Sequence, residues 1–210
     1  SKVSEYDIVQ GTLDAGSNYD LKFVPAKLKV IDKTPQTISV ADIAAKTYGD
    51  AAFALTVTAD KASGLTVFKY ESSDEKVAKV DANGQVTIVG AGKAKITVTE
   101  PGNADYAATT ATVTITVAPK AITVTAVDLK AKTATFAEGG ILEADVNDVK
   151  VDFDRLKTTV KSTTVEGETT LVTVFAVSNF NLTGAKAANY TVTASPEASE
   201  CTSRETIVPP

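Results

Sequence analysis

The stretch ADYAATTATVTITVAPKAITVTA, residues 104–126, decides the fold. Threonine alternates with a small or β-branched hydrophobic residue, a proline interrupts the alternation, and the alternation then resumes. A period of two residues is typical of a strand with one buried face. Proline lacks the amide proton that a central ladder needs and fixes φ, so Pro119 should end one strand and direct the chain into the next. The pattern predicts a joint between two β-modules at Pro119.

The composition extends this prediction to the whole chain. There are 31 Thr and 26 Val among the 210 residues, and no Met, Trp or His. β-Branched side chains lose rotamer freedom in helices and pack well on pleated sheets. Hydrophobic residues make up 43% of the chain, which is enough for packed cores. We therefore expect an all-β protein made of antiparallel sandwiches.

Three tyrosines mark an internal repeat. Tyr19, Tyr106 and Tyr190 each follow a glycine and a short polar residue and precede a strand-like run, and they lie 87 and 84 residues apart. That spacing fits a seven-strand sandwich. We expect the short polar residue to cap a turn, the three rings to be buried and their hydroxyls to bond to backbone, as in a tyrosine corner. Stacking of these rings on sugars is the weaker alternative.

Proline-bearing joints divide the chain between these repeats. The structural prolines are Pro35 and Pro119, and they predict the closing strands of one module in residues 1–33 and complete modules in 34–118 and 119–210. A few strands alone have little core. Residues 1–33 should therefore lean on the second module or belong to a module outside this sequence.

Within the second module, alternation and turn residues locate the strands. Phe53, Leu55 and Val57 alternate with polar or small residues, as do Val113, Ile115 and Val117, so these six should face the core. Asn83-Gly84 predicts a hairpin turn. In the third module, residues 153–161 are rich in Thr and Val, and we expect extended chain there rather than a helix.

Residues 67–99, VFKYESSDEKVAKVDANGQVTIVGAGKAKITVT, carry a family resemblance. The aromatic-Ser-Ser-Asp start, the Val-Ala-x-Val strand, the Asn-Gly hairpin and the Gly-x-Gly turn resemble the bacterial Ig-like group 2 pattern. Tyr70 stands where that family usually has tryptophan. The resemblance implies tandem Ig-like antiparallel β-sandwich modules.

Other segments resemble related bacterial repeats. Residues 38–59 and 101–115 are similar to MBG-type modules, residues 6–30 to the tail of another MBG module, and residues 177–194 to the end of a YDG-type module. Such modules occur in tandem in secreted or surface-attached bacterial proteins, often adhesins or stalks. The resemblance thus implies an extracellular location and supplies no catalytic residues.

Several function classes are disfavoured by the composition. The net charge of −5 disfavours binding to nucleic acid or anionic lipid, because both carry negative charge and attract basic surfaces. No apolar run approaches the roughly 20 residues that span a bilayer, so we expect no direct membrane insertion. Without histidine, the Ser-His-Asp and Cys-His arrangements cannot be built, and we expect no enzyme.

An acidic stretch, residues 138–154, is the only candidate metal site. Hard oxygen ligands of the kind that suit Ca²⁺ are supplied by Asp145, Asp148, Asp152 and Asp154. Ca²⁺ is the cofactor that this stretch suggests. Their spacing fits no EF-hand loop, and alternate carboxylates are typical of the wet face of a strand. A solvated face is therefore the preferred interpretation.

Taken together, the sequence favours a non-catalytic spacer or adhesin stalk on a bacterial surface. The competing hypothesis is a module that binds a glycan or a host or bacterial surface protein through loops of the third sandwich, because residues 138–169 diverge most from the middle repeat. A concave pocket lined by aromatic residues there would favour binding. We expect a monomer.

Overall fold

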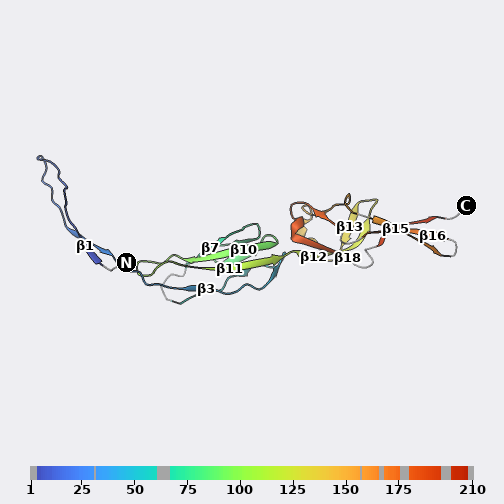
Figure 1. The fold of residues 1–210 in the computed structure, drawn as a ribbon, viewed down its shortest axis with the longest axis horizontal. Coiled ribbons are helices and arrows are strands. Elements are labelled where there is room, and N and C mark those ends of the chain that lie inside the picture. Colours follow the sequence, from blue (N-terminus) through green and yellow to red (C-terminus); the bar gives the residue numbers. More distant parts are fainter. Residues whose placement is uncertain are drawn as a thin grey trace.

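The computed structural model describes residues 4–30, 32–60, 67–156, 158–165, 168–175, 180–194 and 200–207. The chain is nearly all β, as predicted, and its units follow one another along the long axis (Figure 1). The strands are β1 Ser4–Ile8, β2 Ala26–Val30, β3 Ile38–Val40, β4 Lys46–Thr47, β5 Phe53–Ala54, β6 Val57–Ala59, β7 Lys69–Ser72, β8 Ala78–Val80, β9 Gln85–Ile88, β10 Gly92–Glu100, β11 Thr109–Ala118, β12 Lys120–Asp128, β13 Thr133–Phe136, β14 Lys150–Val151, β15 Thr158–Val165, β16 Glu168–Phe175, β17 Leu182–Thr183, β18 Tyr190–Ala194 and β19 Glu200–Ile207. Two 3₁₀ turns, η1 Glu143–Asp145 and η3 Ala187–Asn189, interrupt them.

The middle sandwich consists of β3 to β11. One sheet has the order β4-β11-β10-β7, and β5-β9-β8 and the pair β3-β6 lie apart from it. Along β11 the hydrophobic residues Val113, Ile115 and Val117 are 7%, 0% and 2% exposed. The threonines between them face solvent. The predicted alternation is therefore confirmed, and it buries the apolar face of the longest hairpin.

A tight turn closes the β8–β9 hairpin, as Asn83-Gly84 predicts. Gly84 has φ +77°, and a Cβ at this position would lie 2.9 Å from Cζ of Tyr70. Glycine is thus required both by the backbone conformation and by the aromatic ring above it. Tyr70, which takes the place of the family's tryptophan, also meets Phe68 edge-on with ring centroids 6.3 Å apart.

The third sandwich contains two small sheets, β13-β12-β18 and β14-β17. A separate sheet, β15-β16-β19, completes the described strands. Residues 158–161 lie in a strand, as expected, while residues 153–155 form a turn. The inner faces of the third sandwich meet around Val124, Val127 and Phe180.

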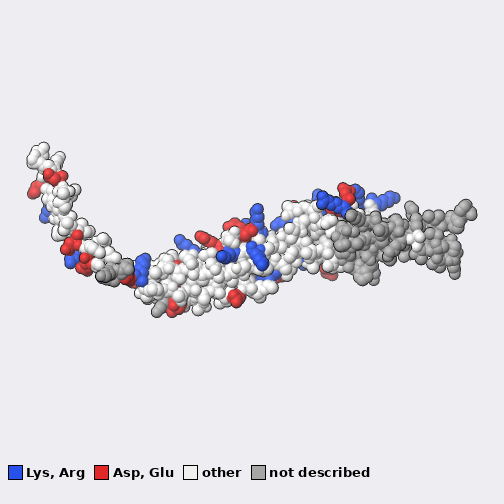
Figure 2. Space-filling model, in the orientation of Figure 1, with Lys and Arg blue, Asp and Glu red and all other residues white. Residues whose placement is uncertain are grey.

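The first unit is a two-stranded ribbon, β1–β2, which projects from the end of the middle sandwich (Figures 1 and 2). The ribbon buries little, because Tyr6, Ile8 and Leu28 are 56%, 48% and 56% exposed. Tyr19, in the connecting loop, is 77% exposed. The expectation that Tyr19 is buried is therefore wrong: no second sheet covers the ribbon among the described residues.

The two later repeats share an unusual parallel pairing. Thr34, at the start of the middle unit, forms a parallel bridge with Tyr106, and Lys120, at the start of the third, pairs in parallel with Tyr190. Each repeat tyrosine thus lies beside the residue that opens its own unit. The boundaries at residues 33/34 and 118/119 remain predictions, and the two prolines differ in register, because Pro35 follows the paired residue Thr34 whereas Pro119 precedes the paired residue Lys120.

Candidate functional site at the joint of two sandwiches

The strongest concentration of buried interactions lies where the middle sandwich meets the third. Strand β11 ends at Ala118, Pro119 is exposed, and β12 begins at Lys120. One hydrophobic cluster spans this joint without a break. Its buried members are Tyr48, Val77, Ala78, Val86, Ala94, Ile115 and Val117 from the middle sandwich and Ile122, Val149 and Tyr190 from the third. Because apolar surface from both units leaves water together, bending at Pro119 would expose it.

A carboxylate joins the two sandwiches inside this cluster. Oδ2 of Asp145 accepts hydrogen bonds from the hydroxyls of Tyr48 and Tyr190, with oxygen separations of 2.7 and 2.6 Å. The two rings meet edge-on, 5.5 Å apart. Tyr48 belongs to the middle sandwich, whereas Asp145 and Tyr190 belong to the third. We call these three residues the Tyr-Asp-Tyr bridge.

Local structure brings each member of the Tyr-Asp-Tyr bridge to the joint. Tyr48 directly follows β4, and its N–H donates to the carbonyl of Ala118, 2.9 Å away. Asp145 is the last residue of η1, and Tyr190 opens β18. The Tyr190 hydroxyl also accepts from the N–H of Leu142, 3.2 Å away, just before η1. The predicted bond from a repeat tyrosine to backbone is therefore present at Tyr190.

The side chains of the Tyr-Asp-Tyr bridge are almost fully buried. Tyr48, Asp145 and Tyr190 are 7%, 4% and 6% exposed. Burial, together with the hydrogen bond to Asp145, raises the pKa of Tyr48 to about 12. Burial likewise raises the pKa of Tyr190, with the same carboxylate as the next cause. Both phenols therefore stay protonated and remain donors across the neutral range. Hydrogen bonds to a charged acceptor in such a setting are roughly twice as strong as neutral ones.

A second polar contact crosses the joint beside the bridge. Oδ1 of Asn189 accepts from the N–H of Ala91, 2.8 Å away, and Nζ of Lys186 donates to the carbonyl of Val89 at 3.4 Å. A Cβ at Gly90 would lie 2.5 Å from the Lys76 carbonyl and 3.2 Å from Asn189 Oδ1. Asn189 therefore does more than cap a turn, because its side chain holds the neighbouring sandwich.

The four acidic calcium candidates do not converge. Asp145 is buried in the bridge, which overturns its interpretation as part of a solvated face. Asp152 pairs with Arg155 at 3.5 Å and Asp154 with Lys132 at 3.0 Å. Asp148 is exposed and uses its carbonyl to accept from the N–H of Lys186. Among the described residues there is no group of three acidic, cysteine or histidine side chains that could hold a metal.

The remaining predicted structural residues lie at the other joint. Tyr106 is half-buried, and its N–H donates to Oδ1 of Asn103, 2.9 Å away, so the predicted turn cap is present there. Pro35 is exposed beside Thr34, whose backbone bonds to Asp105 and Ala107.

The divergent part of the third sandwich contains a groove of about 670 Å³. The groove lies between β13 and β14, and Phe136 and Phe153 contribute aromatic surface to it. Lys132 and Lys150 also line it, and Lys132 has an unusual φ of +52°. This is the concave, aromatic-lined feature that the binding hypothesis requires.

The fold, nearly all β with several antiparallel sheets, is that of an Ig-like β-sandwich protein. Comparison with family models gives a match for residues 55–102 to "Intimin, immunoglobulin-like domain". The matched segment contains β6 to β10 of the middle sandwich and makes up 48 of the 210 residues. It supports a bacterial Ig-like domain of the adhesin type, a non-enzymatic and surface-exposed class. It does not distinguish the MBG and YDG repeats that the sequence resembles.

Two further comparisons bear on this class. No curated protein matches the chain. Among the described residues, no helix has the length and apolar character needed to cross a bilayer.

Sequence reasoning singled out Tyr190 and missed Tyr48 and Asn189 as members of the joint. Tyr48 lies in the sequence Thr-Tyr-Gly-Asp, which is typical of an ordinary surface turn. Gly49 has φ +95°, and a Cβ at this position would lie 3.3 Å from Cδ1 of Leu142. The Asn-Tyr pair at 189–190 was the sequence signal that could have indicated a buried polar contact at the joint, because a buried tyrosine needs a hydrogen-bond partner for its hydroxyl.

Proposed function

We propose that the chain is a non-catalytic spacer or stalk region of a bacterial surface adhesin, in which the joint at Pro119 is held stiff by side chains. The observation that carries the proposal is the Tyr-Asp-Tyr bridge. A flexible linker between modules would need no buried carboxylate shared by two tyrosines across the joint. Interfaces between domains of one chain are otherwise usually polar and mobile.

The energetics support stiffness. If the joint opened, Asp145 would lose the hydrogen bond from Tyr48, which is the one that crosses between the sandwiches, and the apolar residues of the shared cluster would be exposed. On opening, the Tyr48 hydroxyl and Asp145 would exchange their mutual hydrogen bond for bonds to water, and the net contribution of such a bond to a charged group is about 1.5–3 kcal/mol. Loss of this bond is thus enough to disfavour the open form several-fold, before the apolar surface is counted.

Small-angle X-ray scattering of the whole chain tests the proposal. We expect the wild type to scatter as one elongated particle, and Asp145→Ala or Tyr48→Phe to broaden the distribution of end-to-end distances. Asp148→Ala is the matched control, because Asp148 is an exposed carboxylate in the same loop. Circular dichroism separates loosening of the joint from unfolding. A wild type already as broad as Asp145→Ala would refute a stiff joint.

A second candidate function is favoured by the groove between β13 and β14. Its aromatic and apolar lining, with two lysines, suits a glycan or an extended surface protein of the host or of another bacterium. Screening the chain on a glycan array and on immobilised matrix proteins tests this function. Binding that is lost in Phe153→Ser and kept in Asp148→Ala would establish the groove as the site. Binding unaffected by Phe153→Ser would exclude it.

A further inference from the structure

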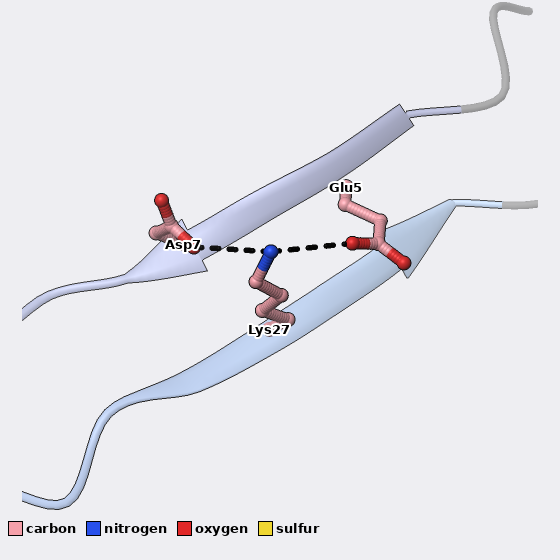
Figure 3. A network of polar contacts seen from close by, with 3 residues as sticks. All are labelled: Glu5, Asp7 and Lys27. Carbon is pink, nitrogen blue, oxygen red and sulfur yellow. Dashed lines mark hydrogen bonds and ion pairs between the residues drawn. The ribbon is translucent and has the colours of Figure 1, made fainter.

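The β1–β2 ribbon has two chemically different faces. In an antiparallel pair, residues directly opposite one another share a face. Tyr6 lies opposite Leu28, and Ile8 lies opposite Ala26, so one face is apolar. The other face carries alternating charges, where Nζ of Lys27 lies 3.4 Å from Oε2 of Glu5 and 4.0 Å from Oδ1 of Asp7 (Figure 3). The charged face is internally neutralised, whereas the apolar face is left in water.

The corresponding hairpin of the middle sandwich shows what such a face normally contacts. Both hairpins enclose a Gly-to-Tyr turn, at residues 16–19 and 102–106, and both lead into a proline joint. In β10–β11, Ile96 and Val98 are each 0% exposed, because other strands of the sandwich cover that face. The ribbon therefore has the pattern of a closing hairpin, but no sheet in the described part of the chain covers its apolar face.

One edge of the ribbon is open as well. Among the described residues, β2 pairs only with β1. The corresponding tyrosines of the other repeats each have a parallel neighbour: Tyr106 has Thr34, and Tyr190 has Lys120. Tyr19 has no such strand in the described part of the chain, and it is 77% exposed. An open edge beside an unpartnered apolar face is a template for strand addition.

We propose that the ribbon is an interaction surface for the opening strand and inner sheet of a further Ig-like sandwich. The incoming strand runs parallel to β2, pairs with Ala26–Val30, and has the alternating threonine and aliphatic character of Lys120–Val124. The sheet behind it covers Tyr6, Ile8 and Leu28. The surface is separate from the Pro119 joint, so this inference and the stalk function can fail independently.

The size of the ribbon argues against a second copy of the ribbon as the occupant. Two strands of five residues at about 3.3 Å per residue span roughly 17 Å. Two such ribbons packed face to face would bury much less than the roughly 800 Å² per partner of a stable interface. A complete sheet with an added edge strand supplies both the area and the main-chain hydrogen bonds.

A tethered strand tests the proposal in the full chain. Residues 119–126, PKAITVTA, are fused ahead of Ser1 through a flexible Gly-Ser linker, which sets an effective concentration of about millimolar. The control carries a scrambled version of the same octapeptide. We expect amide hydrogen exchange in β2, Ala26–Val30, to slow by roughly tenfold with the matched strand. Leu28→Lys should abolish this protection, whereas Lys29→Ala, on the charged face, should preserve it.

Two outcomes would overturn the proposal. Equal exchange with the matched and scrambled strands would show that the edge of β2 does not accept a strand. The second contrary outcome comes from analytical ultracentrifugation of the untethered chain. Dimers that form with increasing concentration and disappear in Leu28→Lys would show that the apolar face binds a second copy of the chain. Sedimentation as a monomer at all concentrations, together with protection by the matched strand, supports the proposal.

Discussion

The two joints of the chain share a proline and differ in almost everything else. At Pro119, the two sandwiches share a hydrophobic cluster, a bridge of three buried polar side chains and an asparagine contact. At Pro35, the joint is formed by backbone bonds of Thr34 to Asp105 and Ala107. The described hydrogen bonds of residues 5–30 stay within the ribbon.

This difference shows that a proline alone does not make a joint rigid. Proline fixes one dihedral angle, but the orientation of two units is determined by what they bury between them. Tyr48 and Asp145 are 97 residues apart in sequence, and their bond joins the two sandwiches beside the covalent link, since the N–H of Tyr48 also donates to the carbonyl of Ala118. The following predictions test the contrast between the buried joint and the exposed ribbon.

The largest effect should come from the core beside the Pro119 joint. Ile115 is 0% exposed, and Ile115→Ala should destabilise the chain by about 2–5 kcal/mol, since it leaves a cavity. Leu28, at 56% exposed in the ribbon, is the matched comparison, and Leu28→Ala should change stability by no more than about 0.5 kcal/mol. Urea unfolding followed by circular dichroism measures both. Equal losses would mean that the ribbon is packed in solution.

Removing the bridge carboxylate should have the next largest effect. Asp145→Ala leaves two buried hydroxyls without their acceptor, at a cost of about 1–3 kcal/mol for each unsatisfied group. Tyr48→Phe removes one donor and should cost less. Asp148→Ala, in the same loop, should be close to neutral. If Asp145→Ala proved as stable as Asp148→Ala, the bridge would contribute nothing to the joint.

Strongly alkaline pH should weaken the Pro119 joint. Burial holds the pKa of Tyr48 near 12, above its ordinary value near 10, so the folded chain keeps a proton that the unfolded chain releases. The stability from this group is therefore fully present below about pH 10 and is lost as the pH rises through about 12. Absorbance at 295 nm measures the ionisation. The late-titrating signal should shrink in Tyr48→Phe and stay unchanged in Tyr19→Phe.

The smallest effect should come from the charged face of the ribbon. The side chains of Lys27 and Glu5 are 65% and 54% exposed, and exposed ion pairs typically contribute between 0 and about 1 kcal/mol. Lys27→Ala should therefore leave the unfolding midpoint nearly unchanged in physiological salt. A loss comparable to that of Asp145→Ala would show that the ribbon is coupled to the rest of the fold.

Local patterns were sufficient to predict most of the middle sandwich. Alternation places Val113, Ile115 and Val117 on the buried face of β11, and Asn83-Gly84 fixes the β8–β9 turn, because both signals depend on neighbours only a few residues away. The repeat of tyrosines likewise predicted that Tyr190 would be buried and bonded to backbone.

The bridge could not be predicted in the same way. Asp145 lies in a run of carboxylates that resembles a wet surface, and only the position of Tyr48 beyond the joint makes it a buried acceptor. Tyr19 is the converse case, since its motif matches the other two tyrosines but its covering sheet is not present. Whether a residue is buried depends on distant partners, which a local pattern does not contain.

The parallel pairing of β12 with β18 has a mechanical consequence. The chain enters the third sandwich at Lys120 and leaves β18 at Ala194, and these two strands lie side by side in parallel. A pull on the two ends of this segment would slide the strands along each other, so their hydrogen bonds would carry the load together instead of opening one at a time. A stretching force along this direction would therefore load the hydrogen bonds of β12 and β18 in shear, the geometry in which they resist together.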